Sequence, residues 1–217
     1  MAGDSVREVR VPASLVLSGS PRRIPHDVVV VRQGDPSSEL FLVERGAVRL
    51  SCVTHDGREL VVALLGAGDV FGEAAVLGEP SPVEARVVGT AIVVAFDVET
   101  ISAVFERAPA TGAQLLRLVA SRLHRTERAL GDAMTADLGT RLARRIHDLA
   151  RSHGAPDEDG VRISIPLTQD ELARMVGASR EAVNRTLRSL VERDLVRTSR
   201  REVVVPDLDA LVTTSRI

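Results

Sequence analysis

Short apolar runs separated by glycine turns dominate the first half of the chain. Several of them end at turn signals such as Q-G-D-P, E-R-G-A or T-H-D-G. The runs cover residues 28–31, 40–43, 48–53 and 60–65, and a last run at 87–88 is joined through Gly89–Thr90 to 92–96. Short β-branched strands at this spacing predict an antiparallel sandwich or roll. His55-Asp56-Gly57 predicts a hairpin tip, because Asp-Gly tolerates the positive φ of tight turns.

From Val98 onward the apolar spacing changes to that of helices. A seam with alternating steps of three and four residues consists of Leu116, Val119, Leu123, Thr126, Leu130, Ala133 and Asp137. A seam of this length predicts a long helix that pairs with a second copy of itself about a two-fold axis. The alternative is a helix that packs back on its own roll. Asp137 is expected to end the seam and to cap a helix over 138–152.

The chain is therefore expected to have an α+β fold in three parts. Residues 1–105 form a roll of the kind that binds a small effector, 106–137 a dimerisation helix and hinge, and 138–217 a helical module. Residues 152–160, S-H-G-A-P-D-E-D-G, are polar and turn-rich, which predicts a surface loop.

Two capped helices are predicted within the last part. Thr168 and Glu171 have the spacing of a capping box, so a helix begins at Gln169. Gly177 provides its C-terminal stop, and Ser179 caps a second, longer helix. A short helix, a glycine turn and a longer amphipathic helix are typical of a helix-turn-helix.

The second helix has a polar face of the kind that reads DNA bases. Its outward residues are Arg180, Glu181, Asn184, Arg185 and Arg188. Arginine donates a bidentate pair to guanine, and glutamate accepts from cytosine. A T-S-R-R-E turn followed by V-V-V predicts a β-wing, with Arg200 and Arg201 near phosphates. The alternative for this face is an ordinary solvated charged surface.

Charge is distributed unevenly along the chain. Residues 1–105 carry 9 Arg and 14 acidic residues, a net charge of −5, whereas residues 138–217 carry 14 Arg and 12 acidic residues, a net charge of +2. The C-terminal part is therefore the expected partner of a polyanion.

The order of these parts resembles the Crp–Fnr regulators, the family of the cyclic-AMP receptor protein. G-D-V-F-G-E, residues 68–73, is similar to the family's G-D-x-F-G-E stretch, and S-R-E-A-V-N-R, residues 179–185, is similar to its S-R-E-T-V-x-R recognition helix. The resemblance implies that Arg180, Glu181 and Arg185 read a palindrome with TGTGA-like half-sites and that Thr168 contacts phosphate. Gln169 stands where the cyclic-AMP branch often has a basic residue, which weakens one phosphate contact.

The resemblance also implies an effector pocket, which this chain has changed. Gly72 and Glu73, followed by Ala74, match the pair that binds ribose in the family. The family's phosphate-binding R-S-A or R-T-A triplet falls on Val83, Glu84 and Ala85. An apolar residue and an anion thus replace a cation and a hydroxyl, so cyclic AMP is not the expected effector.

Two further positions bear on this pocket. The family's adenine-contacting Thr-Ser pair falls on Thr126 and Glu127. Thr126 is either a surviving ligand contact or a small polar residue tolerated at a dimer seam. Arg86 lies on the same strand face as Glu84, opposite Val83 and Ala85, and is expected to pair with Glu84 at the surface.

No cofactor is expected. Cys52 is the single cysteine, which excludes a cysteine-ligated iron–sulfur cluster, and the five histidines have no metal spacing. No hydrolase, P-loop or metalloprotease motif is present, so the chain is not expected to be an enzyme.

The expected function is that of a cytoplasmic, homodimeric transcription regulator without a membrane segment. Its partners would be double-stranded DNA, a second copy of the chain and, through the acidic 155–160 loop, RNA polymerase. A regulator that responds to cyclic nucleotides through a rearranged pocket is one alternative. A small-molecule-binding protein or enzyme with a protein-contacting helical tail is another.

Overall fold

The computed structural model describes residues 19–199 and 201–214, which form two compact units that divide between residues 124 and 125. Each unit has its own buried core. The long helix α4 (Pro109–Thr135) contains the point of division.

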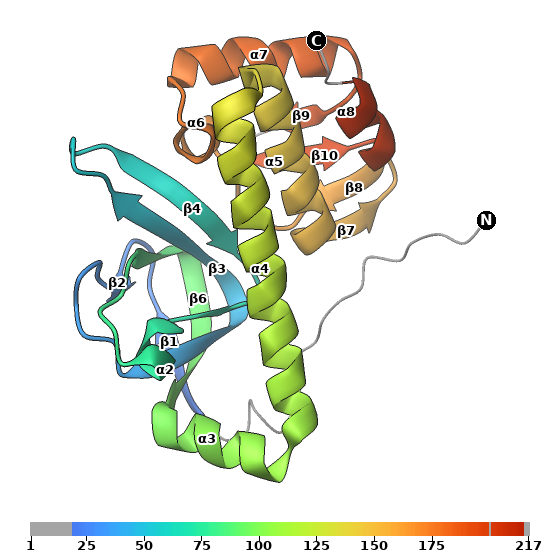
Figure 1. Ribbon diagram of the computed structural model, residues 1–217. Helices are drawn as coiled ribbons and strands as arrows, with labels where there is room; N and C mark the ends of the chain where they lie inside the picture. The colour runs from blue at the N-terminus through green and yellow to red at the C-terminus, as the bar shows by residue number, and fades with distance from the viewer. Residues whose placement is uncertain (1–18, 200, 215–217) are drawn as a thin grey trace. The chain divides into compact units, whose positions relative to one another are not determined.

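The first unit is built on an antiparallel sheet (Figure 1). Its strands are β1 (Ser20–Ile24), β2 (Val29–Val31), β3 (Glu39–Val53), β4 (Glu59–Leu65), β5 (Val70–Phe71) and β6 (Glu84–Asp97). The order is β1-β6-β3-β4, with β2 paired to β6 and β5 paired to β3. The antiparallel roll predicted from the sequence is confirmed.

Strand β3 is longer than predicted, because it joins two of the expected runs. Strand β6 joins 87–88 to 92–96 as predicted, but begins earlier, at Glu84. The expected break at E-R-G-A is a pair of register shifts between β3 and β6, at Val43/Arg45 and at Arg45/Ala47. Such irregularities bend a strand without ending it. Strands β1 and β5 were not predicted, since S-P-R-R-I and V-F lack an alternating apolar pattern.

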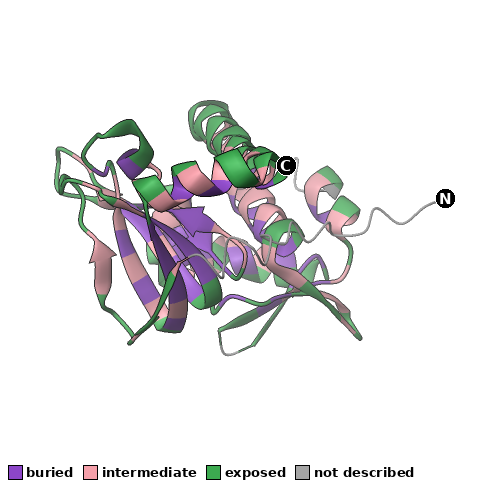
Figure 2. Ribbon diagram, turned by 90° about the horizontal axis from the view of Figure 1, so that it is seen from below, coloured by how far each residue is buried: buried purple, intermediate pink, exposed green. Residues whose placement is uncertain are grey.

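Alternation along the strands gives the first unit two apolar clusters (Figure 2). Phe41 and Val43 face the inside of the roll, where the ring of Phe41 stacks on that of Phe71 with centroids 4.9 Å apart. Leu40 and Leu42 face the other way, into the cluster that the following helices cover.

Helix α3 (Val98–Arg107) begins at the cap Asp97, whose side chain accepts the amide of Thr100 at 2.7 Å. Helix α4 follows it. Leu115 and Val119 of α4 pack against the cluster of Leu40 and Leu42. Val119 therefore contacts the roll, which is the alternative that the sequence left open for this helix.

The large apolar residues of α4 that are exposed form a stripe. Its members are Leu116, Leu123, Leu130 and Met134, with 69%, 57%, 64% and 80% of their surface exposed. We call these four residues the α4 stripe. Leu116, Leu123 and Leu130 recur at steps of seven residues, so they lie along one side of the helix.

The second unit combines four helices with a small sheet. The helices are α5 (Leu138–His153), α6 (Gln169–Val176), α7 (Arg180–Glu192) and α8 (Leu208–Thr214). The sheet has the order β7-β8-β10-β9, with β7 (Gly154–Asp157), β8 (Gly160–Ile163), β9 (Arg197–Ser199) and β10 (Glu202–Val205). Asp137 caps α5 by accepting the amide of Thr140 at 2.8 Å, as predicted.

The surface loop predicted for residues 152–160 is wrong in part. Helix α5 continues to His153, and β7 pairs with β8 around the turn at 158–159. A Cβ on Gly154 would lie 2.1 Å from the carbonyl oxygen of Ala150, so glycine permits this close approach. Pro156 is tolerated because β7 lies at the edge of the sheet. The polar composition thus belongs to an edge strand.

Among the described residues, no helix combines the length and the hydrophobicity that a membrane crossing requires.

Candidate nucleic-acid interface and ligand pocket

Helices α6 and α7 form the predicted helix-turn-helix, and each begins at a side-chain cap. The Thr168 hydroxyl accepts the Glu171 amide at 3.1 Å, and the Glu171 carboxylate accepts the Thr168 amide at 2.7 Å. Gly177 ends α6 in the left-handed region at φ 62°. Ser179 then caps α7 by accepting the amide of Ala182 at 3.2 Å. These contacts define where α6 begins and ends and where α7 begins.

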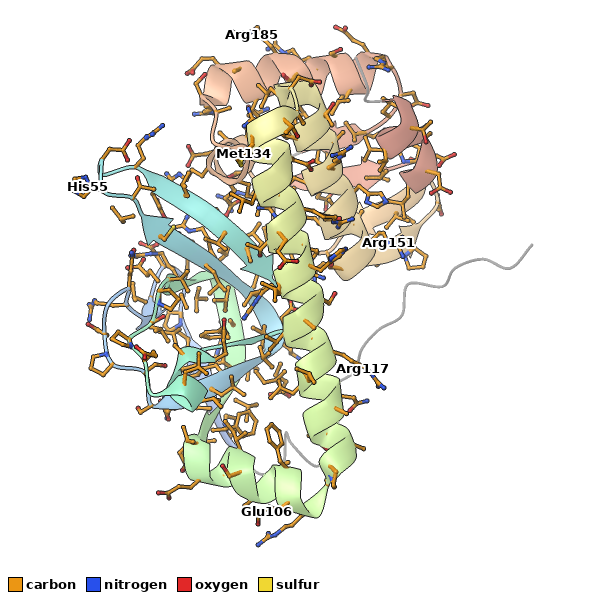
Figure 3. The ribbon with its side chains drawn as sticks, viewed as in Figure 1. His55, Glu106, Arg117, Met134, Arg151 and Arg185 are labelled. Carbon is orange, nitrogen blue, oxygen red and sulfur yellow. The ribbon has the colours of Figure 1, made fainter. Side chains whose placement is uncertain are left out.

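The inner face of α7 is apolar and its outer face is charged. Val183, Leu187 and Leu190 are buried, as predicted. Arg180, Glu181, Arg185 and Arg188 are exposed and Asn184 is half-buried. Arg185 points away from the body of its domain (Figure 3).

None of the five polar side chains on this outer face forms an ion pair or a side-chain hydrogen bond with another residue of 19–199 or 201–214. These five side chains, which we call the outer row of α7, therefore have all their side-chain donors and acceptors free for another molecule.

The other predicted DNA contacts differ in their surroundings. The Thr168 hydroxyl donates to the Glu171 carboxylate at 2.9 Å, so its hydrogen is already used within the capping box. The first-turn N–H groups of Gln169 and Asp170 have no intrahelical partner and remain available to a phosphate. Arg200, predicted on the wing, lies outside the described residues.

The predicted ribose-binding residues lie at the junction of β5 and the short helix α2 (Ala74–Leu77). Gly72 has φ +83°, and a Cβ there would lie 2.6 Å from the Glu39 carbonyl oxygen, so only glycine fits without strain. Ala74 is buried. The Glu73 carboxylate forms an ion pair with Arg122 of α4, whose guanidinium also donates to the Val70 carbonyl at 2.7 Å.

Val83, Glu84 and Ala85 do not present a common surface. Val83 packs against the roll core and Ala85 is 1% exposed within it. Glu84 turns to the opposite face of the sheet, because side chains alternate along a strand. The carboxylate at this place therefore points away from the roll interior, and the triplet offers no cation on the inside.

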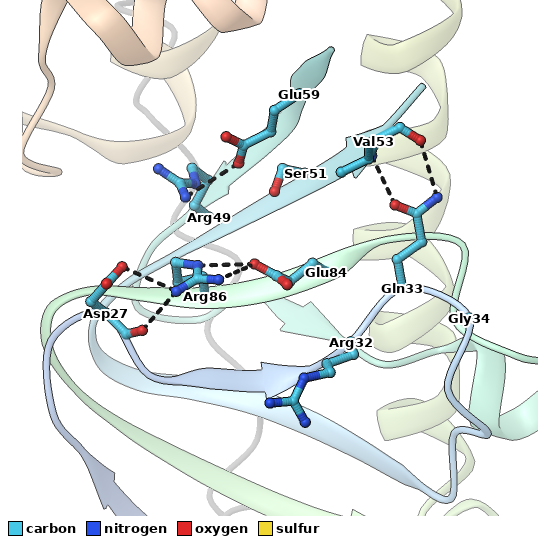
Figure 4. Close-up of a pocket in the computed structure, with 10 residues that line it drawn as sticks. All are labelled: Asp27, Arg32, Gln33, Gly34, Arg49, Ser51, Val53, Glu59, Glu84 and Arg86. Atoms are coloured by element: carbon cyan, nitrogen blue, oxygen red, sulfur yellow. Dashed lines mark hydrogen bonds and ion pairs between the residues drawn. The ribbon is translucent and has the colours of Figure 1, made fainter. Parts of the chain in front are cut away.

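Arg86 shares the outer face with Glu84, as predicted, and pairs with it (Figure 4). Its Nε and a terminal nitrogen donate to one Glu84 oxygen at 2.9 and 2.7 Å, and the other terminal nitrogen donates to the Asp27 carbonyl at 2.9 Å. The hydrogen bond to Glu84 raises the pKa of the Arg86 guanidinium. Arg86 thus lines an outward cleft and takes no part in the roll interior.

Sequence reasoning missed the contact of Arg122 with the predicted ribose-binding residue Glu73. Arg122 contacts Val70 and Glu73, which lie about fifty positions earlier in the chain, and no local pattern marks that contact. Thr126 and Glu127 are exposed on α4, beyond the division between the two units.

Within the described part of the chain, no three His, Cys, Asp or Glu side chains are grouped as a metal site would require.

Both units match known domain families. Residues 21–108 match the cyclic nucleotide-binding domain, and residues 140–214 match the Crp-like helix-turn-helix domain.

Similar proteins extend over nearly the whole chain. A CRP-like cAMP-activated global transcriptional regulator of Mycobacterium tuberculosis is 31% identical over 206 residues, covering 94% of this chain and 92% of its own. The cAMP-activated global transcriptional regulator Vfr of Pseudomonas aeruginosa is 33% identical, covering 85% of this chain and 88% of its own.

A solved structure supports the same grouping. The c-di-GMP responsive global regulator CLP of Xanthomonas campestris superposes with a TM-score of 0.72 at 26% identity, over 90% of this chain and all of that one. A roll that matches the cyclic nucleotide-binding domain and a helix-turn-helix of the Crp type therefore occur here in one chain, which belongs to the Crp/Fnr family of DNA-binding transcription regulators.

Proposed function

We propose that this regulator acts as a homodimer on a palindromic site with TGTGA-like half-sites, and that its DNA binding does not depend on cyclic AMP. The observation that carries the proposal is the free outer row of α7. Arg180, Glu181 and Arg185 occupy the N-terminal half of that helix, the part that enters a major groove in helix-turn-helix proteins.

The row favours sequence-specific binding over simple attraction to phosphate. A glutamate next to DNA is repelled by the backbone unless it accepts a hydrogen bond from a base. Glu181 lies between two arginines that satisfy guanine edges, so the pattern suits a G–C-containing half-site. Backbone contacts would come from the first turn of α6, from Ser179 and from Arg188, with Arg200 of the wing as a further candidate.

The α4 stripe supports the dimer. It exposes four large apolar side chains on one helix, and burying each of them in a partner contributes about 1.5–3 kcal/mol. Two copies related by a two-fold axis would bury the stripe against itself, and would present two α7 helices to the two halves of a palindrome.

Independence from cyclic AMP follows from the surroundings of Glu73 and Glu84. A cyclic nucleotide requires a cation for its phosphate, whereas Val83 is apolar and Glu84 turns to the outer face beside Arg86. Losing an arginine–phosphate contact, typically about 1.5–3 kcal/mol, weakens binding by one to two orders of magnitude.

Two measurements test the proposal. Selection from random-sequence DNA should enrich a TGTGA-like palindrome, and a gel shift on that site should give the same affinity with and without cyclic AMP. Calorimetric titration with cyclic AMP should show no binding in the micromolar range. Enrichment of an unrelated sequence contradicts the base readout, and micromolar cyclic AMP binding contradicts the effector proposal.

One observation favours a second candidate, a regulator that responds to a cyclic nucleotide through a rearranged pocket. Arg122 places a guanidinium that is 14% exposed beside Glu73, and the Mycobacterium relative is named as cAMP-activated. In this candidate a phosphate replaces Glu73 as the partner of Arg122. Cyclic AMP binding that is lost in Arg122→Gln and kept in Arg117→Gln, a change to an exposed arginine of the same helix, would establish it.

A further inference from the structure

The outer face of the roll has a charged cleft that the proposed DNA reading does not use (Figure 4). Its volume is about 820 Å³, which is ample for a small metabolite. The lining comes from β3, β4 and β6 and from the segments on either side of β2, all within the first unit.

The carboxylates of this cleft already have partners. Glu84 and Asp27 are paired with Arg86, and Glu59 is paired with Arg49 at 3.3 Å. An acidic side chain that is held by arginine has little capacity left for a cation. The lining is therefore a poor site for a metal or an amine.

Donors, by contrast, remain unused. The Nε of Arg49 is buried and has no hydrogen-bond partner among the described residues, which costs free energy until an acceptor arrives. Arg32 lines the same cleft and forms no ion pair or side-chain hydrogen bond within 19–199 and 201–214. Ser51 lines the cleft as well, two residues after Arg49 on β3 and at the position paired with Glu84.

We propose that this cleft binds a small anion with a carboxylate or phosphate group, held by Arg49 and Arg32. The planar guanidinium fork matches both groups. Ser51 would donate a third hydrogen bond. Glu84 acts as an internal competitor, because its carboxylate occupies the arginine that an anion would otherwise contact.

The site is distinct from the roll interior. Leu50 and Ala85, the strand neighbours of Arg49, Ser51, Glu84 and Arg86, face the core on the other side of the sheet. A ligand in the outer cleft therefore does not occupy the place where a cyclic nucleotide would be expected.

The test is an NMR titration of the full chain, which follows the Nε–Hε signals of the arginines. Inorganic phosphate and succinate are the probes, with chloride adjusted to keep the ionic strength constant. We expect a saturable shift of the Arg49 signal with at least one probe. Arg32→Gln, which removes an unpaired side chain and should not affect folding, is expected to weaken binding about tenfold or more.

Two further variants separate a built site from general electrostatics. Arg58→Gln removes a cation at the exposed tip of the β3–β4 hairpin, outside the cleft, and should leave the probe affinity unchanged. Glu84→Gln releases Arg86 and should tighten binding severalfold, a gain that unfolding cannot produce.

The proposal is overturned if neither probe gives a saturable shift. It is also overturned if Arg32→Gln and Arg58→Gln behave alike, or if Glu84→Gln gives no gain. No DNA is present in these titrations, so the result does not depend on whether the proposed half-site is correct.

Discussion

The outer face of α7 and the outer cleft of the roll are both rich in arginine, but they use it differently. In the cleft, Arg86 and Arg49 are held by carboxylates of their own sheet. On α7, Arg180 and Arg185 have no side-chain partner among the described residues. The paired arginines of the cleft present little net positive charge to a polyanion, whereas the unpaired arginines of α7 present their full charge.

This contrast explains how one chain with a net charge of −2 can bind a polyanion at one end. Pairing within the cleft cancels charge locally, so the residual donors suit a small ligand. In the function that we propose, the unpaired cations on α7 attract DNA and then contact its bases.

The largest expected effect comes from removing the readout pair on α7. Each bidentate base contact contributes about 1–3 kcal/mol of discrimination, so Arg180→Ala combined with Glu181→Ala should weaken binding to the selected palindrome about a hundredfold or more. Gel shifts on the palindrome and on scrambled DNA measure the change.

Binding to scrambled DNA should change far less, because it depends mainly on phosphate contacts. Arg58→Ala, an arginine removed from the other unit, is the matched control and should leave both affinities as they are. Equal losses on specific and scrambled DNA would show that the pair acts only through charge.

The next effect concerns the α4 stripe. Leu123→Asp places a charge in the middle of the surface that we propose pairs with a second copy, and should shift the chain to a monomer at micromolar concentration. Sedimentation velocity measures this shift. Arg117→Asp alters an exposed residue that is not part of the stripe, and is expected to leave the dimer intact. A Leu123→Asp protein that sediments like the unmodified chain would refute the stripe as the interface.

A smaller effect on the free energy of unfolding is expected from removing either N-terminal cap of the helix-turn-helix, Thr168 of α6 or Ser179 of α7. The Thr168 hydroxyl accepts the Glu171 amide and donates to the Glu171 carboxylate, whereas the Ser179 hydroxyl only accepts the Ala182 amide. Removing an N-cap costs about 0.5–2 kcal/mol, and Thr168→Ala should fall nearer the upper value than Ser179→Ala. Urea denaturation gives both free energies of unfolding. The reverse order would mean that the hydrogen bond from the Thr168 hydroxyl to the Glu171 carboxylate contributes little.

Local sequence patterns predicted the caps, the turn glycine and the buried face of α7, because each depends on residues within a few positions of one another. Thr168 and Glu171 are three residues apart, and their hydrogen bonds appear as expected. The same holds for Asp137 and Thr140. The antiparallel roll was predicted for a similar reason, since each of its strands is a short β-branched run that ends at turn residues.

Long-range contacts could not be predicted in this way. Arg122 contacts Glu73, which lies 49 positions earlier in the chain. Val119 packs on the roll, although its spacing fits the seam that was predicted to pair with a second copy. The periodicity of α4 is compatible with Val119 facing a second copy or facing the roll, and only tertiary packing decided between the two. The strand β7 was missed because glycine and proline are rare inside strands, and only its place at a sheet edge makes them acceptable.

The smallest expected effect compares the two units through their aspartate caps, Asp97 of α3 and Asp137 of α5. Each carboxylate accepts a backbone amide, which holds the pKa of both groups below the usual value of about 3.9. A lowered folded-state pKa stabilises the protein above that usual value, and the contribution is lost as the pH falls through the lowered one.

Asn caps a helix about as well as Asp, so Asp137→Asn removes mainly the charge. At pH 7 the substitution should lower the free energy of unfolding by about 0.3–1 kcal/mol, the usual contribution of an anion at a helix N-terminus. The difference should shrink below pH 4, where the carboxylate becomes protonated. Urea denaturation of both proteins at several pH values checks this. A difference that stays constant down to pH 3 would mean that the charge of Asp137 does not stabilise α5.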